Sequence, residues 1–292
     1  MRSAKCGTDH CAPPTSLTPL GTLHSAVRTV RTLKVILQYD GTDLVGWQRQ
    51  KTGRSVQGLL EEALSAIDGA PVTVHGAGRT DAGVHAIAQA ASARVTTALE
   101  APTLVRALNA KLPPDVRVNS VADAPDDFHA RFSAKSKTYR YILLEADVAG
   151  PFAQRYVWRV PGRLNVEAMA EGARALVGRH DFTAFQSTGS AVTHAFRTVT
   201  AARVAEWPAD GPAPAPGVGS NQGPGTRLVV FDVTADGFLR HMVRAMTGTL
   251  VEVGLGRRPA AGVRAVVDGR ARATAGATAP AAGLWLVSVD YC

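Results

Sequence analysis

The sequence has few of the features that mark secreted or membrane proteins. Its 292 residues include only three cysteines, Cys6, Cys11 and Cys292, and these lie at the two ends of the chain. Cysteines placed in this way do not indicate a disulfide framework. No apolar run approaches the ~20 residues of a membrane-spanning helix, and the N-terminal region lacks the apolar core of a secretory signal. We therefore expect a soluble, cytoplasmic protein.

Motifs for common cofactors are also missing. The Gly-Lys-Ser/Thr sequence that a P-loop requires does not occur in the chain. Gly76-Ala77-Gly78 begins like a dinucleotide-binding fingerprint, but Asp81 stands where the third glycine should be, and a strand is expected where a helix should follow. A carboxylate at that point would repel a pyrophosphate. We therefore expect no bound cofactor.

Metal ligands do not group convincingly either. Cys6, His10 and Cys11 lie close together, but a zinc site needs a fourth ligand, and none is evident. His75 and His85 could suggest a metal, yet no second cluster completes a site. The sequence therefore predicts no metal site, with the cysteines in a tail and the two histidines as polar edge residues.

One twelve-residue stretch stands out from this background. Residues 75–86 read His-Gly-Ala-Gly-Arg-Thr-Asp-Ala-Gly-Val-His-Ala and separate two strand-like runs, at 71–74 and 87–95. Three glycines allow a tight turn with backbone angles that other residues resist. The turn presents one guanidinium, Arg79, and one carboxylate, Asp81, and a rigid loop can offer such groups for chemistry. The alternative is an Arg–Asp pair that only closes the hairpin.

The charge balance favours an acidic partner. Lys and Arg together number 32 against 24 for Asp and Glu, and the formal net charge is +8. Nucleic acid is the commonest partner of a basic protein, because its phosphates attract a positive surface. This signal is weak alone, since many basic proteins bind no RNA.

The first part of the chain follows a recognisable order of elements. Residues 1–30 are polar and lack periodicity, so we expect a disordered extension. The elements expected within the following half, residues 31–132, are a strand at 33–39, a helix capped by Ser55 and Gly69, the hairpin around Asp81, a helix at 102–111 and a strand at 116–121. The order β-α-β-β-α-β is that of a ferredoxin-like module.

The second half, residues 133–292, repeats the theme more loosely. Its expected elements are strands at 138–144, 198–206, 227–234 and 284–291 and helices at 165–177, 238–253 and 260–267. Residues 208–225 are rich in Pro, Gly and Ala and lack apolar periodicity, so we expect a flexible surface insertion in a hairpin. The fold class is therefore α+β, with two halves.

The stretch at 75–86 resembles the active-site motif of the tRNA pseudouridine synthase A family. Further stretches resemble that family's other motifs in the same order, and together they extend from about residue 33 to residue 291. These stretches are 39–50, 126–134, 139–141, 180–185, 241–244 and 283–291.

The resemblance implies a fold and an activity. The fold is two ferredoxin-like halves joined through a central, mainly antiparallel sheet, with a basic cleft between them. The activity is that of an isomerase, which converts uridine to pseudouridine at positions 38, 39 and 40 in the anticodon stem-loop of tRNA. The family needs no cofactor for this reaction and forms homodimers.

The resemblance also implies roles for particular residues. Asp81 is the nucleophile, and it must be ionised to act. A neighbouring cation favours the charged carboxylate, and the two candidates are Arg79 and Arg244. Tyr139 stacks on the target uracil, and Leu284 lines the pocket with apolar surface.

Other basic residues fit contacts to the RNA backbone. On the helix expected at 238–253, Arg240 and Arg244 are four residues apart and share a face. The candidate RNA-binding residues are Arg131, Lys135, Lys137, Arg140, Arg240 and His241. Each of them could equally be a solvated surface residue.

Two other functional classes stay open at this point. One is a non-catalytic RNA-binding protein of the same fold, against which the intact set Asp81, Arg79, Tyr139 and Arg244 argues. The other is a nucleotide-binding enzyme that uses the glycine loop for phosphate, against which Asp81 argues. A test for pseudouridine in tRNA without added cofactor separates all three.

Overall fold

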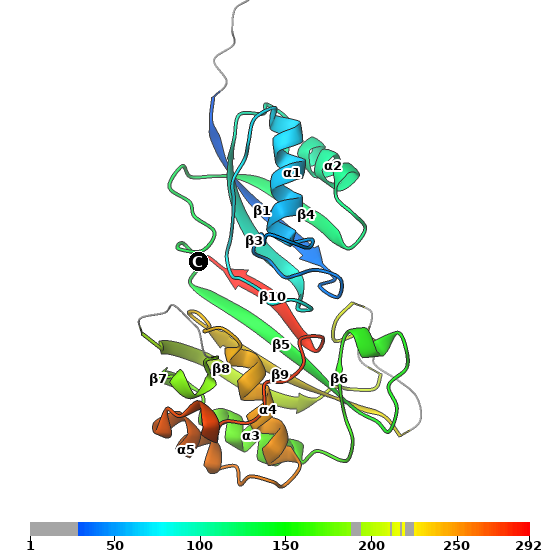
Figure 1. The fold of residues 1–292 in the computed structure, drawn as a ribbon, viewed down its shortest axis with the longest axis vertical. Coiled ribbons are helices and arrows are strands. Elements are labelled where there is room, and N and C mark those ends of the chain that lie inside the picture. The colour runs from blue at the N-terminus through cyan, green and yellow to red at the C-terminus, as the bar shows by residue number, and fades with distance from the viewer. Residues whose placement is uncertain (1–28, 188–193, 211, 217, 220–224) are drawn as a thin grey trace, which may run out of the picture.

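The computed structural model describes residues 29–187, 194–210, 212–216, 218–219 and 225–292. Two α/β halves share one ten-stranded sheet, with helices of both halves packed against it (Figure 1). The extension predicted to be disordered, residues 1–30, lies almost wholly outside the described residues.

The first half has the predicted order of elements. These are β1 (Arg31–Tyr39), α1 (Val56–Asp68), β2 (Val74–Gly76), β3 (His85–Val95), α2 (Ala101–Lys111) and β4 (Val116–Ala124). The Ser55 side chain accepts a hydrogen bond from the backbone N–H of Gly58, and Gly69 ends the helix with a left-handed φ of 77°. Both predicted caps of α1 are therefore confirmed.

The second half contains more elements than the sequence indicates. They are β5 (Ser136–Glu145), β6 (Trp158–Val160), α3 (Val166–Arg174), β7 (Gly178–Asp181), β8 (Phe196–Glu206), β9 (Arg227–Ala235), α4 (Met242–Gly254), α5 (Gly262–Gly269) and β10 (Leu284–Asp290). The short strands β6 and β7 were not predicted. The antiparallel hairpin of β8 and β9 is confirmed.

The last strand joins the two halves. The strand order is β4-β1-β3-β10-β5-β9-β8-β7, so β10 lies between one half and the other (Figure 1). It runs antiparallel to β5 and parallel to β3, where Trp285 and Leu286 pair with His85 and Ala86. One continuous core beneath the helices includes Leu33 of β1, Tyr141 of β5 and Leu250 of α4. The predicted union of two halves through a mainly antiparallel sheet is therefore confirmed.

The start of α4 differs from the prediction. The helix begins at Met242, not at residue 238, because His241 has a φ of 62° and therefore a left-handed backbone. A left-handed residue interrupts helical geometry, so Arg240 precedes the helix and does not share a helical face with Arg244.

Part of the insertion at 208–225 packs against the rest of the molecule. Among its described residues, Ala215 and Val218 are buried in a cluster with Trp285 and Leu228. The Trp207 indole also donates a hydrogen bond of 2.7 Å to the Pro212 carbonyl. The sequence predicted a flexible surface insertion, whereas Ala215 and Val218 pack against β9 and β10, because isolated apolar positions can be buried without any periodic pattern.

Candidate active site

The loop between β2 and β3 is fixed to the rest of the first half through Thr80. The backbone N–H of Trp47 donates to the Thr80 carbonyl at 3.0 Å. A Cβ on Gly46 would lie 2.5 Å from the same carbonyl oxygen, and Gly46 has a φ of 100°. Glycine is therefore required there for the close approach of two backbone segments.

A buried side-chain network holds the loop from beneath. The Tyr39 hydroxyl lies 2.8 Å from Oγ1 of Thr80, and the Gln89 amide donates to the Gly78 carbonyl at 2.9 Å and to the Tyr39 hydroxyl at 3.3 Å. Burial raises the pKa of Tyr39 to about 12, although its hydrogen bonds to Thr80 and Gln89 oppose this. The phenol is therefore neutral at physiological pH, and the network is a purely hydrogen-bonded anchor.

Asp81 follows Thr80 and faces α4 of the other half. Oδ2 of Asp81 lies 3.3 Å from Nη1 of Arg244 and 3.4 Å from Nε2 of His241. The Arg244 guanidinium is itself positioned by a 2.7 Å hydrogen bond from Nε to the Ala279 carbonyl. The Asp81 side chain is 29% exposed, and within the described part of the chain no group donates to its Oδ1. One carboxylate oxygen is thus held by Arg244 and His241 while the other is available.

The two arginine candidates for this carboxylate are now distinguished. Arg244 forms the ion pair with Asp81. Arg79 is exposed and makes no ion pair with any described residue. A guanidinium that bridges the two halves can favour the ionised carboxylate, whereas Arg79 faces solvent and is available for another contact.

His241 lies at the carboxylate, although the sequence suggested an RNA-backbone contact. Burial and the nearby charges of Arg244 and Arg240 lower the pKa of His241, while the charge of Asp81 acts in the opposite direction. Its left-handed backbone places it at the N-cap, just before the first residue of α4. Arg240 itself is exposed.

Tyr139 of β5 lies against the same loop. It is buried, and its ring meets Phe238 edge-on with centroids 5.0 Å apart. A Cβ on Gly78 would lie 3.5 Å from the Tyr139 hydroxyl, which is van der Waals contact and places the phenol against the loop. Burial raises the pKa of Tyr139 far above its usual value, with smaller contributions from Tyr39 and Asp81, so the phenol stays protonated. Leu284 is buried at the start of β10, where it pairs with Tyr141.

Lys137 and Arg140, two basic residues of β5, lie on opposite faces of the sheet. Side chains alternate along a strand, so Lys137 lies on the face of Tyr139 and Arg140 on the other face. Lys137 is buried, and its Cδ would lie 3.6 Å from a Cβ on Gly78. Arg140 forms two hydrogen bonds of 2.8 and 2.9 Å to Asp232.

Arg140 is therefore a structural residue in this arrangement. Its guanidinium also packs 4.8 Å from the Trp207 ring and donates to the Pro214 carbonyl at 2.9 Å. Its placement beside the other candidate RNA contacts was wrong, because Asp232, 92 positions away, satisfies its charge. Arg131 and Lys135 are exposed, as a contact with RNA requires.

The two histidines of the loop motif are far from equivalent. His75 is exposed, but His85 is fully buried, so the prediction of a polar edge residue is wrong for His85. Its Nδ1 accepts a 3.0 Å hydrogen bond from the N–H of Gly41, and its ring stacks on Trp285 at 4.4 Å. No three metal-ligating side chains come together anywhere in the described portion of the chain.

Several residues of the site escaped the sequence analysis. Tyr39, Thr80 and Gln89 were not singled out, although Tyr39 lies in one of the motif stretches and Thr80 in the loop itself. Gln89 could have been found from the sequence, since a glutamine within an apolar strand needs a hydrogen-bonding partner when it is buried. Phe238 could not have been found in this way, because its packing on Tyr139 depends on the irregular segment before α4.

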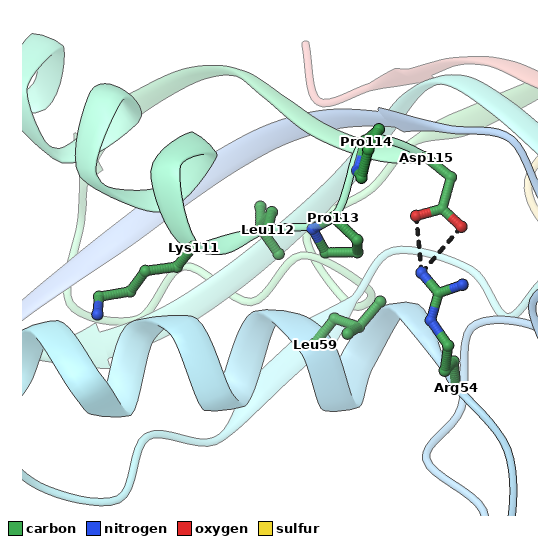
Figure 2. A pocket seen from close by; sticks show the side chains of 7 residues that line it. All are labelled: Arg54, Leu59, Lys111, Leu112, Pro113, Pro114 and Asp115. Atoms are coloured by element: carbon green, nitrogen blue, oxygen red, sulfur yellow. Dashed lines mark hydrogen bonds and ion pairs between the residues drawn. The ribbon is translucent and has the colours of Figure 1, made fainter.

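A separate surface hollow of about 560 Å³ lies at the ends of α1 and α2 (Figure 2). Arg54 and Asp115 form an ion pair of 2.8 Å at one side of it. The other lining residues are Leu59, Lys111, Leu112, Pro113 and Pro114. None of the residues that the sequence placed in the active site lines this hollow.

Among the described helices, none is long and apolar enough to span a membrane.

Comparison with known proteins identifies the family of this chain. The family model described as tRNA pseudouridine synthase matches residues 35–133 and 173–292. A tRNA pseudouridine synthase A of Syntrophotalea carbinolica is 42% identical over 89% of this chain and 96% of its own length. Enzymes of the same name from Methylacidiphilum infernorum and Moorella thermoacetica are 44% and 42% identical, over 88% and 89% of this chain and 94% and 99% of their own lengths. The chain belongs to the tRNA pseudouridine synthase family.

Proposed function

We propose that this protein isomerises uridine to pseudouridine in tRNA and that Asp81 is the nucleophile. The observation that carries the proposal is the state of the Asp81 carboxylate. Its Oδ2 is held by Arg244 and His241, while Oδ1 has no donor among the described residues. The side chain is partly exposed on a loop anchored through Thr80. A carboxylate fixed in this way can attack a substrate without first breaking its own hydrogen bonds.

The reaction needs little beyond such a group. The bond between N1 of uracil and the ribose breaks, the base rotates, and a bond forms between C5 and the same ribose carbon. C5 loses a proton and N1 gains one, so atoms and electrons balance without water, metal or redox cofactor. A single carboxylate with proton transfer therefore suffices, whether it attacks the base or the sugar.

Tyr139 completes the binding of the base in this proposal. The target uridine must leave its helix, which costs a few kcal/mol that a stacking pocket can recover. The Tyr139 ring lies against the loop that carries Asp81, and Leu284 adds apolar surface nearby. Since the phenol is neutral, its hydroxyl can donate a hydrogen bond and take part in proton transfer once the base is bound.

In this proposal the protein modifies the same uridines as the family that it resembles. We assign positions 38, 39 and 40 of the anticodon stem-loop, a cytoplasmic reaction and a homodimer. Support comes from the ordered motif resemblance and from relatives named tRNA pseudouridine synthase A that this chain matches over nearly its full length. Exposed Arg131, Lys135 and Arg240, with Arg79 on the loop, are the candidates for contacts with the RNA backbone.

The test uses tRNA transcripts carrying tritium at C5 of uridine, incubated without added cofactor. Because C5 becomes bonded to the ribose, each turnover releases its label to water, and digestion of the RNA reveals pseudouridine. Transcripts in which positions 38, 39 and 40 are cytidine should release no label. Tight binding of tRNA without release of label would instead identify a non-catalytic RNA-binding protein.

A further inference from the structure

An aromatic stack lies on the segment that connects β4 to β5. The rings of His75 and His129 are stacked with centroids 4.8 Å apart, and those of His129 and Phe132 are 4.4 Å apart. The Arg131 guanidinium lies 5.6 Å from the centre of the Phe132 ring. The Phe132 ring is tilted against His129 and is 76% exposed, so this row of three rings ends in solvent.

The turn that carries these rings is internally fixed. The Ser133 N–H donates to the His129 carbonyl at 2.9 Å, and the His129 N–H donates to the Ser133 hydroxyl at 3.1 Å. Nδ1 of His129 accepts the N–H of Arg131 at 3.1 Å. Burial, then the neighbouring His75 and Arg131, lower the pKa of His129, so the middle ring of the stack is neutral at physiological pH.

The same turn is also anchored to the sheet. The Ala130 N–H donates to the Ser92 hydroxyl of β3 at 3.0 Å, and the Tyr291 phenol donates to the Ala130 carbonyl at 2.8 Å. Ala130 is fully buried. The exposed position of Phe132 therefore follows from a rigid turn, which costs free energy because an apolar ring stays in water.

The stack borders the candidate active site. His75 lies in β2, which leads directly into the loop of Asp81. At the other side, burial and the charge of Arg131 lower the pKa of Lys137, whose side chain lies against Gly78. Residues 128–138 include Arg131, Lys135 and Lys137 and no carboxylate, so the immediate sequence around the stack is cationic.

We propose that the exposed ring of Phe132, which adjoins His129 and Arg131, stacks on an unpaired nucleobase of the RNA substrate. The inference rests on the proposed function, because that function supplies the RNA. A neutral aromatic face beside cations matches a nucleobase beside phosphates, since bases stack on aromatic rings and guanidinium planes. A single exposed ring is small beside the roughly 800 Å² per partner of a stable protein interface.

The experiment compares tRNA affinity among variants of the full chain. Phe132→Ala should bind a tRNA transcript about tenfold more weakly in fluorescence anisotropy, as expected for the loss of one stacked base. Phe132→Tyr keeps the ring face and should bind within about twofold of the parent. The matched control is Phe152→Ala, because Phe152 is 84% exposed and has no ring contact with any described residue.

Salt dependence separates stacking from charge. In Phe132→Ala the slope of log affinity against log salt should equal that of the parent, because stacking releases no counterions. Arg131→Gln should shallow the slope by about 0.7–0.9, the contribution of one phosphate contact. A series of stem-loop RNAs, each lacking one loop base, then identifies the stacked base. The RNA without that base should bind the parent more weakly than the complete RNA, and it should bind Phe132→Ala and the parent with equal affinity.

Three results would overturn the inference. They are an affinity of Phe132→Ala equal to that of Phe152→Ala, a weaker affinity that Phe132→Tyr fails to restore, and a fall in oligomeric mass in Phe132→Ala. The last result would assign the ring to a contact between two copies of this chain. If affinity depends on Phe132 but tritium is never released from tRNA, the stacking of Phe132 on RNA is supported and the proposed isomerisation is wrong.

Discussion

Asp40 and Asp81 are two aspartates with similar exposure, 27% and 29%, and each has a histidine nitrogen within 3.4 Å. Asp40 accepts hydrogen bonds at both oxygens, from the Thr42 N–H at 3.0 Å and the Tyr156 phenol at 2.8 Å. Asp81 is held at Oδ2 alone, by ion pairs longer than 3.2 Å. Exposure therefore does not distinguish these two carboxylates, whereas the number of satisfied oxygens does, and in the proposed function only the less satisfied one reacts.

The strongest test of the contrast is Asp81→Asn. The amide keeps the size of the side chain but removes the nucleophilic charge, so we expect single-turnover pseudouridine formation to fall by at least about a thousandfold. Because the lost ion pairs are long and partly solvated, the free energy of unfolding should change by less than about 1 kcal/mol. Retention of more than a few per cent of the parent rate would remove Asp81 from the nucleophile's role.

Tyr139→Phe tests whether the reaction needs the Tyr139 hydroxyl in addition to the free Oδ1 of Asp81. The ring that stacks on uracil is kept, so tRNA should bind within about threefold of the parent. Loss of the hydroxyl should slow the single-turnover rate by about a hundredfold, as for removal of a group that assists proton transfer. Tyr139→Ala should impair both binding and rate. Full activity in the Phe variant would limit Tyr139 to stacking.

The anchoring of Asp81 is tested by Tyr39→Phe, which deletes the hydroxyl bonded to Thr80. We expect about a tenfold lower rate at saturating tRNA with little change in KM, because the loop is less rigidly placed while the RNA contacts remain. Tyr156→Phe is the matched control, since its phenol also makes a 2.8 Å hydrogen bond, but to Asp40 outside the loop. Equal rates in the two variants would show that the Tyr39 network only stabilises the fold.

Asp40→Asn is expected to have the smallest effect on turnover and a clear effect on stability. At neutral pH the rate should stay within about threefold of the parent, while the free energy of unfolding falls by about 1–2 kcal/mol. A rate loss as deep as that of Asp81→Asn would show that the two carboxylates do not differ in the way proposed.

The same variant has a defined pH dependence. Partial burial opposes the charge on Asp40, but the hydrogen bonds that it accepts, including those from Thr42 and Tyr156, outweigh burial and hold its pKa well below the usual value. The stabilisation is therefore complete above the unfolded-state pKa of about 3.9 and is lost as the pH falls below it toward the folded-state pKa. Denaturant titrations should show the gap between parent and Asp40→Asn narrowing below about pH 4.

Local chemistry allowed the first half to be predicted from its sequence. Ser55 and Gly69 define α1 because a hydroxyl satisfies a free N–H and a glycine accepts a left-handed backbone. The start of α4 could not be predicted in the same way. His241 adopts the left-handed region in a place where apolar periodicity continues, and a tertiary contact with Asp81 accompanies that conformation.

The candidate site shows the same division between local and distant information. The loop with Arg79 and Asp81 was evident from glycine spacing, and the family resemblance paired Arg244 with Asp81. Arg140 was misplaced because its partner Asp232 lies on another strand, and pairing registers between distant strands leave no trace in a single sequence. The same reason hides the partners of Ala215 and Val218.

The position of β10 has a consequence for synthesis of the protein. The parts of β3 and β5 that contact it, residues 85–86 and 136–141, can pair there only after residues 284–290 have been made, 139 residues beyond the end of β5. At translation rates of about 5–20 residues per second, that delay is on the order of ten seconds. Throughout it, two strand edges stay open to pairing with other chains, and Asp81 and Arg244 belong to halves that no strand yet joins. The proposed site is therefore complete only when the final strand is in place.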